Sequence, residues 1–254
     1  MSDLAVPLAD AGTMIRRSVR LSGRSMDAMI VALALPVMLM LMFVYLFGGA
    51  IDTGTRYVDY VVPGVLLVCA GFGVGATAVG VSTDLSSGIV DRFRSMDVRA
   101  QWLLTGHVTA SVLRNLASTA LVIAVALAVG FRSPASPAAW VAAIALFALV
   151  LFALSWLCAA LGTITRSPEA ANGATFLISF LPYPSSAFVP IRTMPSWLQG
   201  FARHQPATCI VDAMRGLLCG GPVESAAWQS VAWCAGILAV SVLASGPLFR
   251  RRVG

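Results

Sequence analysis

The sequence contains no lysine, because all 17 of its basic residues are arginine. A nucleotide-binding P-loop needs a lysine to reach the β and γ phosphates, and a Schiff-base enzyme needs a lysine amine. Neither site can be built from this chain. If ATP drives the protein, another chain must bind it.

Metal-binding patterns are also missing. The two histidines form no HExxH motif and the five cysteines form no CxxC pair, so we expect no metal site and no catalytic site of this kind. The cysteines are odd in number, and we interpret them as small apolar residues. Cys209 and Cys219 would pair only if both faced an oxidising exterior.

Charge is scarce as well. Only 11% of residues are charged and 58% are hydrophobic, against about 25% and about 45–50% in soluble domains. Five runs without any charged residue can each supply the roughly 20 residues that cross a bilayer. A cleaved signal peptide is a poor alternative for the first run, which is long and begins late.

A sixth candidate run contains Arg114. The sequence thus predicts an all-α membrane protein of six transmembrane helices, forming one domain over residues 1–254. The expected spans cover about 27–48, 60–83, 108–131, 138–162, 170–190 and 226–249.

The arginines predict the orientation, since short cytoplasmic loops collect Lys and Arg. With the N-terminus inside, only five of the 17 lie outside: Arg56, Arg132, Arg192, Arg203 and Arg215. We expect a multi-pass protein of the cytoplasmic membrane with both termini cytoplasmic. The net charge of +6 is too small and scattered for nucleic-acid binding, and it suits anionic lipid headgroups.

The segment before the first span has separated basic and apolar faces. Arg16, Arg17, Arg20 and Arg24 occupy one quarter of a helical wheel. This pattern favours an amphipathic helix over about 10–24 on the inner leaflet. The alternative is an unstructured positive-inside signal.

Two features inside the spans have structural interpretations. Gly71 and Gly75 form a GxxxG pair that lets helix backbones approach closely. Arg114 would be costly at the bilayer centre, so we expect it to snorkel to the inner surface or its helix to begin later. A role in a transport pathway is the alternative.

The fifth span is irregular, since "FLPYPSSAFVP" holds three prolines that an uninterrupted lipid-facing helix would not tolerate. We expect residues 182–221 to break near the outer surface and return as short re-entrant helices. Pro190, Trp197, Asp212 and Arg215 would then form an external gate. An ordinary loop is the alternative.

The most charged segment is "DLSSGIVDRFRSMDV", residues 84–98. Ile89, Phe93 and Met96 form one apolar stripe at helical spacing, beside a flank of alternating charge. We expect a short amphipathic helix over about 86–98 that docks on another protein from the cytoplasmic side. A solvated loop is the alternative, and a carboxylate active site fits poorly because nearby arginines keep the acids ionised.

The blocks "GIVDRFRSM" and "SPEAANG", with the later "AFVP" and "MPSWLQ", carry a resemblance that covers nearly the whole chain. They resemble the membrane subunit of type-2 ATP-binding cassette (ABC) exporters, most closely the daunorubicin-resistance type of actinobacterial permease. The resemblance implies two six-helix subunits, either two copies or a pair of paralogues, each contacting a separate ATPase that binds ATP and Mg²⁺.

The resemblance also assigns roles to segments. The helix that couples the permease to its ATPase matches Asp84, Gly88, Ile89, Asp91, Arg92, Phe93, Arg94 and Met96. Asp84 stands where relatives often carry glutamate. The family's interfacial helix matches residues 14–24, and its external re-entrant helices match about 185–218.

We therefore expect the permease of an ATP-driven exporter of amphipathic drugs or antibiotics, with a pathway lined by Phe43, Tyr45, Phe176 and Tyr183. Export of a cell-envelope lipid or glycolipid is the alternative. An ion-coupled carrier or an intramembrane enzyme would need acids or a nucleophile at mid-depth. None of the 11 acids lies clearly in the middle of a span.

Overall fold

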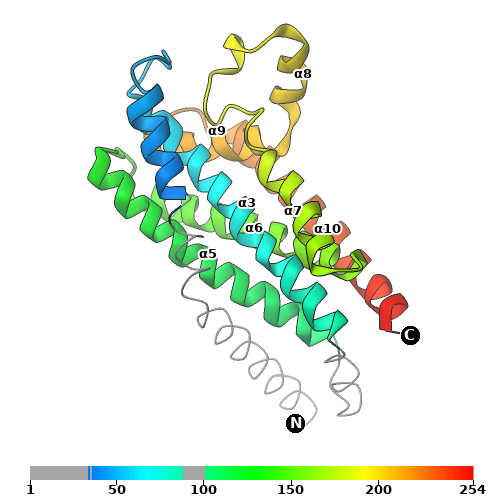
Figure 1. Cartoon of the computed structure of the whole chain (residues 1–254). Helices are drawn as coiled ribbons and strands as arrows, with labels where there is room; N and C mark the ends of the chain where they lie inside the picture. Colours follow the sequence, from blue (N-terminus) through cyan, green and yellow to red (C-terminus); the bar gives the residue numbers. More distant parts are fainter. Residues whose placement is uncertain (1–33, 35, 88–100, 254) are drawn as a thin grey trace.

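The computed structural model describes residues 34, 36–87 and 101–253, and in these ranges all regular structure is helical (Figure 1). Within them, four helices are long and apolar enough to cross a membrane. They are α3 (Tyr57–Ser86), α5 (Gln101–Val129), α6 (Pro137–Ile164) and α10 (Glu224–Val253). The predicted all-helical membrane class is confirmed.

The first and fifth predicted spans differ from these four. An apolar helix covers Pro36–Phe47 and ends in the π-helical turn η1 (Phe43–Phe47). The first predicted span begins at about residue 27, and that part of it lies outside the described residues. Helix α7 (Pro168–Phe180) has only 13 residues, about 20 Å. The expected span of about 170–190 is therefore too long, and the helix ends just before Pro182, where the prolines predict a break.

Helix α5 begins at Gln101, before the predicted start at about 108. Arg114 therefore lies near the middle of a 29-residue helix, and the expectation of a late helix start is wrong. Its guanidinium reaches α3, where Nη2 donates to the carbonyl oxygen of Gly73 at 3.3 Å. A backbone carbonyl of a neighbouring helix thus satisfies part of its hydrogen-bonding capacity within the bundle.

Helix α3 forms the core of the bundle and packs against α5, α6 and α7. Small residues permit its close contacts. A Cβ at Gly71 would lie 3.0 Å from the Cα of Ser179, and one at Gly75 would lie 3.2 Å from Oγ1 of Thr175. The predicted role of the GxxxG pair in helix packing is confirmed, and its partner is α7.

The starts of α6 and α7 follow the same local rule. Ser136 and Ser167 are the N-caps, and their hydroxyl oxygens accept from the third following N–H, at 3.2 Å in both helices. Pro137 and Pro168 then take the first helical position, where no N–H is needed. The Ser-Pro pairs therefore fix both starts.

The bundle has two distinct ends (Figure 1). One end carries the short helix α8 (Ser196–His204), preceded by the 3₁₀ turn η2 (Ile191–Thr193) and followed by α9 (Pro206–Cys219). The end of α3, the start of α5 and the end of α10 lie at the opposite end. Short re-entrant helices were predicted for residues 182–221, and the structure places η2, α8 and α9 within that range.

Candidate functional site

The segment between α7 and η2 forms a compact turn held against α9. Its residues 181–188 are turns, and Gln205, just before α9, donates from Nε2 to the carbonyl oxygen of Pro184. Tyr57 of α3 donates from its hydroxyl to the carbonyl oxygen of Phe188 at 3.1 Å. Two backbone carbonyls of the turn are thus bonded by side chains from outside it.

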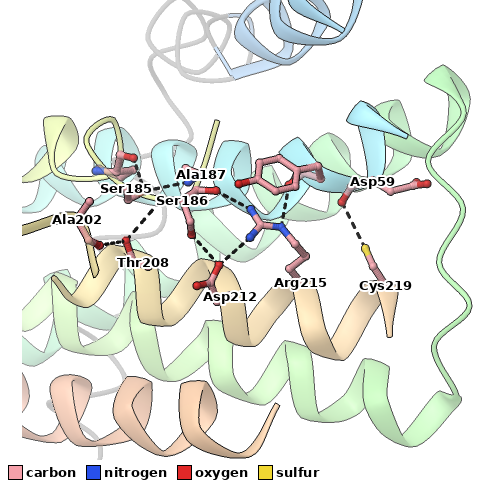
Figure 2. A network of polar contacts seen from close by, with 11 residues as sticks. Asp59, Ser185, Ser186, Ala187, Ala202, Thr208, Asp212, Arg215 and Cys219 are labelled. Carbon is pink, nitrogen blue, oxygen red and sulfur yellow. Dashed lines mark hydrogen bonds and ion pairs between the residues drawn. The ribbon is translucent and has the colours of Figure 1, made fainter. Parts of the chain in front are cut away.

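An ion pair on α9 forms the centre of a polar network (Figure 2). Arg215 Nη1 lies 2.7 Å from Asp212 Oδ1, one helical turn away. The same Oδ1 accepts from the Ser186 hydroxyl at 2.7 Å, and Arg215 Nη2 donates to the Ser186 carbonyl oxygen at 2.7 Å. Both charged residues therefore bind one residue of the turn.

Arg215 also binds α3. Its Nε donates to the carbonyl oxygen of Tyr60 at 3.2 Å, and its guanidinium carbon lies 3.8 Å from the centre of the Tyr60 ring. This geometry combines a charge-assisted hydrogen bond with a cation–π contact. One side chain thus joins α9, the turn and α3.

The network extends to α8 and to the start of α3. The Ser186 N–H donates to Thr208 Oγ1 at 3.4 Å, and that hydroxyl donates to the carbonyl oxygen of Ala202 in α8 at 2.5 Å. At the far end of α9, the thiol of Cys219 donates to the carbonyl oxygen of Asp59 at 3.3 Å (Figure 2). The helices at this end therefore share one set of polar contacts, and we refer to Tyr60, Ser186, Thr208, Asp212 and Arg215 as the α9 network.

Four residues were predicted for an external gate, and the structure brings two of them together. Asp212 and Arg215 belong to the α9 network, whereas Pro190 is the N-cap of η2, and its carbonyl oxygen accepts from Thr193. Trp197 lies on α8, with 79% of its surface exposed. The i,i+3 spacing of the ion pair was visible in the sequence, but Tyr60 and Ser186 were not predicted because they act largely through backbone carbonyls.

An open pocket lies between α3 and α7, away from the α9 network. Its volume is about 300 Å³, and aromatic, aliphatic and polar side chains line it together. The lining residues are Phe72, Gly75, Ala76, Val79, Asn172, Thr175, Phe176 and Ser179.

Only one of the four predicted pathway residues lines this pocket, Phe176. Phe43 and Tyr183 instead stack on Phe188, with ring centroids 4.2 and 5.4 Å away, and Tyr45 is 73% exposed. Aromatic character alone did not distinguish residues that pack in the core from residues that face open space.

The predicted coupling and interfacial residues lie mostly outside the described part of the chain. This applies to Gly88, Ile89, Asp91, Arg92, Phe93, Arg94 and Met96, and to Arg16, Arg17, Arg20 and Arg24. Asp84 is described. It is buried in the last turn of α3, and its Oδ2 lies 2.9 Å from Nε2 of His107 in α5.

The described residues contain no group of three or more His, Cys, Asp or Glu side chains that could hold a metal ion. The polar sites are instead an Asp84–His107 pair between α3 and α5 and an Asp212–Arg215 pair within α9, and the open pocket is built from neutral side chains. The described helices, four of them long and apolar enough to cross a membrane, define a multi-pass helical membrane protein.

Comparison with known proteins identifies the family. Residues 10–219 match the ABC-2 type transporter family, and the chain belongs to this family as a membrane permease subunit. This confirms the resemblance inferred from the sequence.

Two kinds of relative illustrate the match. The chain is 31% identical over 188 residues to the daunorubicin resistance ABC transporter permease protein DrrB1 of Streptomyces coeruleorubidus, covering 73% of this chain and 66% of that protein. It is 24% identical over 222 residues to the probable doxorubicin resistance ABC transporter permease protein DrrC of Mycobacterium tuberculosis, covering 87% of this chain and 80% of the relative.

Proposed function

We propose that this chain is the permease subunit of an ATP-driven exporter that moves amphipathic drugs out across the cytoplasmic membrane. The open pocket between α3 and α7 is the observation that carries this proposal. Phe72 and Phe176 offer aromatic surface there, while Asn172, Thr175 and Ser179 offer hydrogen-bonding groups. A planar aromatic compound with polar edges fits such a lining.

The energy must come from a separate ATPase. The chain has no lysine for a P-loop, so ATP and Mg²⁺ are bound by the partner. The predicted coupling helix over about 86–98 would contact that ATPase from the cytoplasmic side, with both termini on the same side. A second permease copy or a paralogue would complete a pathway of six spans from each subunit.

Transport then follows alternating access. ATP binding closes the two ATPase subunits, the coupling helices move with them, and the membrane halves tilt to expose the pocket outward. The α9 network lies at the end of the bundle where the compound leaves. It keeps α9, the turn after α7 and α3 in contact as these helices move.

The pocket is tested by dye transport into inside-out vesicles that contain the permease and its ATPase, with daunorubicin as the probe. We expect Phe176→Ala to reduce transport about tenfold, because an aromatic contact contributes about 0.5–1.5 kcal/mol beyond the area it buries and about 1.4 kcal/mol is a factor of ten. Phe152→Ala is the matched control, since Phe152 is also a half-exposed ring but packs on Trp156 outside this pocket.

Equal transport by the two variants would contradict a drug site in this pocket. The lipid alternative predicts a different result, in which daunorubicin is not moved by any variant but a fluorescent phospholipid or glycolipid is.

Co-purification of the ATPase with Phe93→Ala, compared with wild type, tests the coupling helix. Unchanged assembly and ATP hydrolysis by a correctly inserted variant would reject that role.

A further inference from the structure

Asp84 and His107 join α3 to α5 at the end of the bundle opposite α8. Nε2 of His107 lies 2.9 Å from Oδ2 of Asp84, and the two side chains are only 16% and 12% exposed. When the Asp84 carboxylate is ionised it can only accept hydrogen bonds, and Nε2 of His107 is then the donor in this contact. The contact is a part-buried, charge-assisted bond between two spanning helices.

The ring of His107 packs against α3 at Gly80, which has no side chain. Gly80 lies one turn before Asp84 on α3, and a Cβ added there would be 3.1 Å from Cε1 and 3.2 Å from Nδ1 of His107. Gly80 and Asp84 are on the same face of α3. The ring is thus held between a glycine surface and a carboxylate, which fixes its orientation as well as its distance.

The position of the carboxylate makes this bond important. Asp84 lies in the last turn of α3, where the negative end of the helix dipole disfavours a second negative charge. A buried carboxylate there needs a donor. His107 supplies one from α5, 23 positions along the chain.

We propose that Asp84 and His107 form a clamp across the two helices that flank the coupling segment, and that this clamp sets how much ATP hydrolysis is converted into transport. The inference rests on the proposed exporter function. Movement received by the segment between them reaches the bundle through the end of α3 and the start of α5. The buried side chains of Val81, Leu103 and Leu104 already pack these two ends together, and the Asp84–His107 bond adds a directional contact that fixes how one end is oriented on the other.

Asp84 and His107 are positioning residues on this account, since neither touches the transported compound. A merely structural role would lower the amount of folded complex, and transport and ATP hydrolysis would fall together. The clamp instead predicts a change in the ratio of compound moved to ATP hydrolysed. That ratio is independent of how much complex survives purification.

The experiment uses the complete complex of permease and ATPase in proteoliposomes, measuring daunorubicin uptake and phosphate release in the same sample. We expect His107→Ala to lower the transport-to-hydrolysis ratio at least about tenfold, as fits the loss of one hydrogen bond to a charged group, and Asp84→Ala to lower it at least as much. His107→Gln should retain at least about half of the ratio because it keeps a neutral donor. Thr109→Val is the matched control, since its hydroxyl bonds to the Thr105 carbonyl in the same helix.

Gly80→Ala perturbs the geometry and leaves both partners chemically intact. We expect a smaller loss, about twofold in the ratio, as the added methyl group displaces the ring by a few tenths of an ångström. This variant tests the clamp even if the Asp84 and His107 variants do not assemble.

Two failures can be told apart. A wild-type complex that hydrolyses ATP but moves no daunorubicin contradicts the drug-export function. The clamp proposal is then rejected too, because it rests on that function. A wild-type complex that transports, with His107→Ala and Gly80→Ala keeping the wild-type ratio, overturns the clamp alone. A falling ratio with partial rescue by His107→Gln supports it.

Discussion

Arg215 is the residue whose removal should affect the α9 network most. It contacts α3, α9 and the turn after α7 at once. Arg215→Met keeps much of the length and apolar stem of the side chain but removes every donor. The change leaves the carbonyl oxygens of Tyr60 and Ser186 without this partner and leaves Asp212 with the Ser186 hydroxyl.

The size of the effect can be built from these contacts. Each carbonyl that loses its donor costs about 1–3 kcal/mol, and the low end applies because the Arg215 side chain is 19% exposed. The ion pair adds less than about 1 kcal/mol, since the Asp212 side chain is 41% exposed and water screens it. With about 0.5–1 kcal/mol for the Tyr60 stack, we expect a loss of about 3 kcal/mol in the free energy of unfolding.

Thermal unfolding of the purified permease in detergent measures this loss. For a chain of this size, about 3 kcal/mol corresponds to a fall of about 6–12 °C in the midpoint. Arg203→Met is the matched control, because Arg203 is an exposed arginine in the same region whose Nη2 reaches only Gln199, at 3.3 Å. Arg215→Lys should fall between them, since lysine keeps the charge without the planar fork.

The result that refutes this reasoning is an equal midpoint for Arg215→Met and Arg203→Met. The contacts of Arg215 would then be replaced by water at no cost. A fall in both variants would assign the effect to net charge at this end of the bundle and not to the network.

Two further predictions concern packing and thiols. Gly162→Ala should lower the unfolding midpoint, because the new Cβ would lie 2.5 Å from the carbonyl oxygen of Ala78. Gly173→Ala is the control and should not lower it, because a Cβ there would have nothing within 4 Å. Thermal unfolding compares the two variants, and equal midpoints would reject the close α3–α6 contact. Cys209 and Cys219 should remain unpaired after mild oxidation, since ten helical positions separate them by about 15 Å and a disulfide needs Cα atoms within about 7 Å. Intact mass under non-reducing conditions measures this, and a loss of two hydrogen atoms that maps to this pair would contradict it.

Much of the fold could be predicted because the bilayer imposes it. Long runs without charge predict spanning helices, and the GxxxG pair of Gly71 and Gly75 predicts a close helix contact. Helix boundaries were harder to predict from the sequence. The start of α5 at Gln101 lies in a mixed stretch where apolar content is low, so a composition window begins the helix too late and places Arg114 near a surface.

The polar contacts could be predicted only where both partners lie on one helix. Asp212 and Arg215 are three positions apart, and their pairing follows from helix geometry. Asp84 and His107 are 23 positions apart, and Arg215 reaches Tyr60 across 155 positions. Such pairs depend on how helices cross, and that is decided by many small packing contacts along each helix.

The Asp84–His107 pair and the α9 network both bind the same helix, α3. Asp84 and Tyr60 both belong to α3, whose 30 residues span about 45 Å. One end is bonded to α5 through His107, and the other to α9 through Arg215. Between them, α3 packs on α5, α6 and α7, with buried side chains and close glycine contacts. A packed core does not deform continuously, so a displacement of one end of α3 moves the other end as well. In the proposed exporter, α3 therefore connects the clamp beside the coupling segment to the α9 network where the compound leaves.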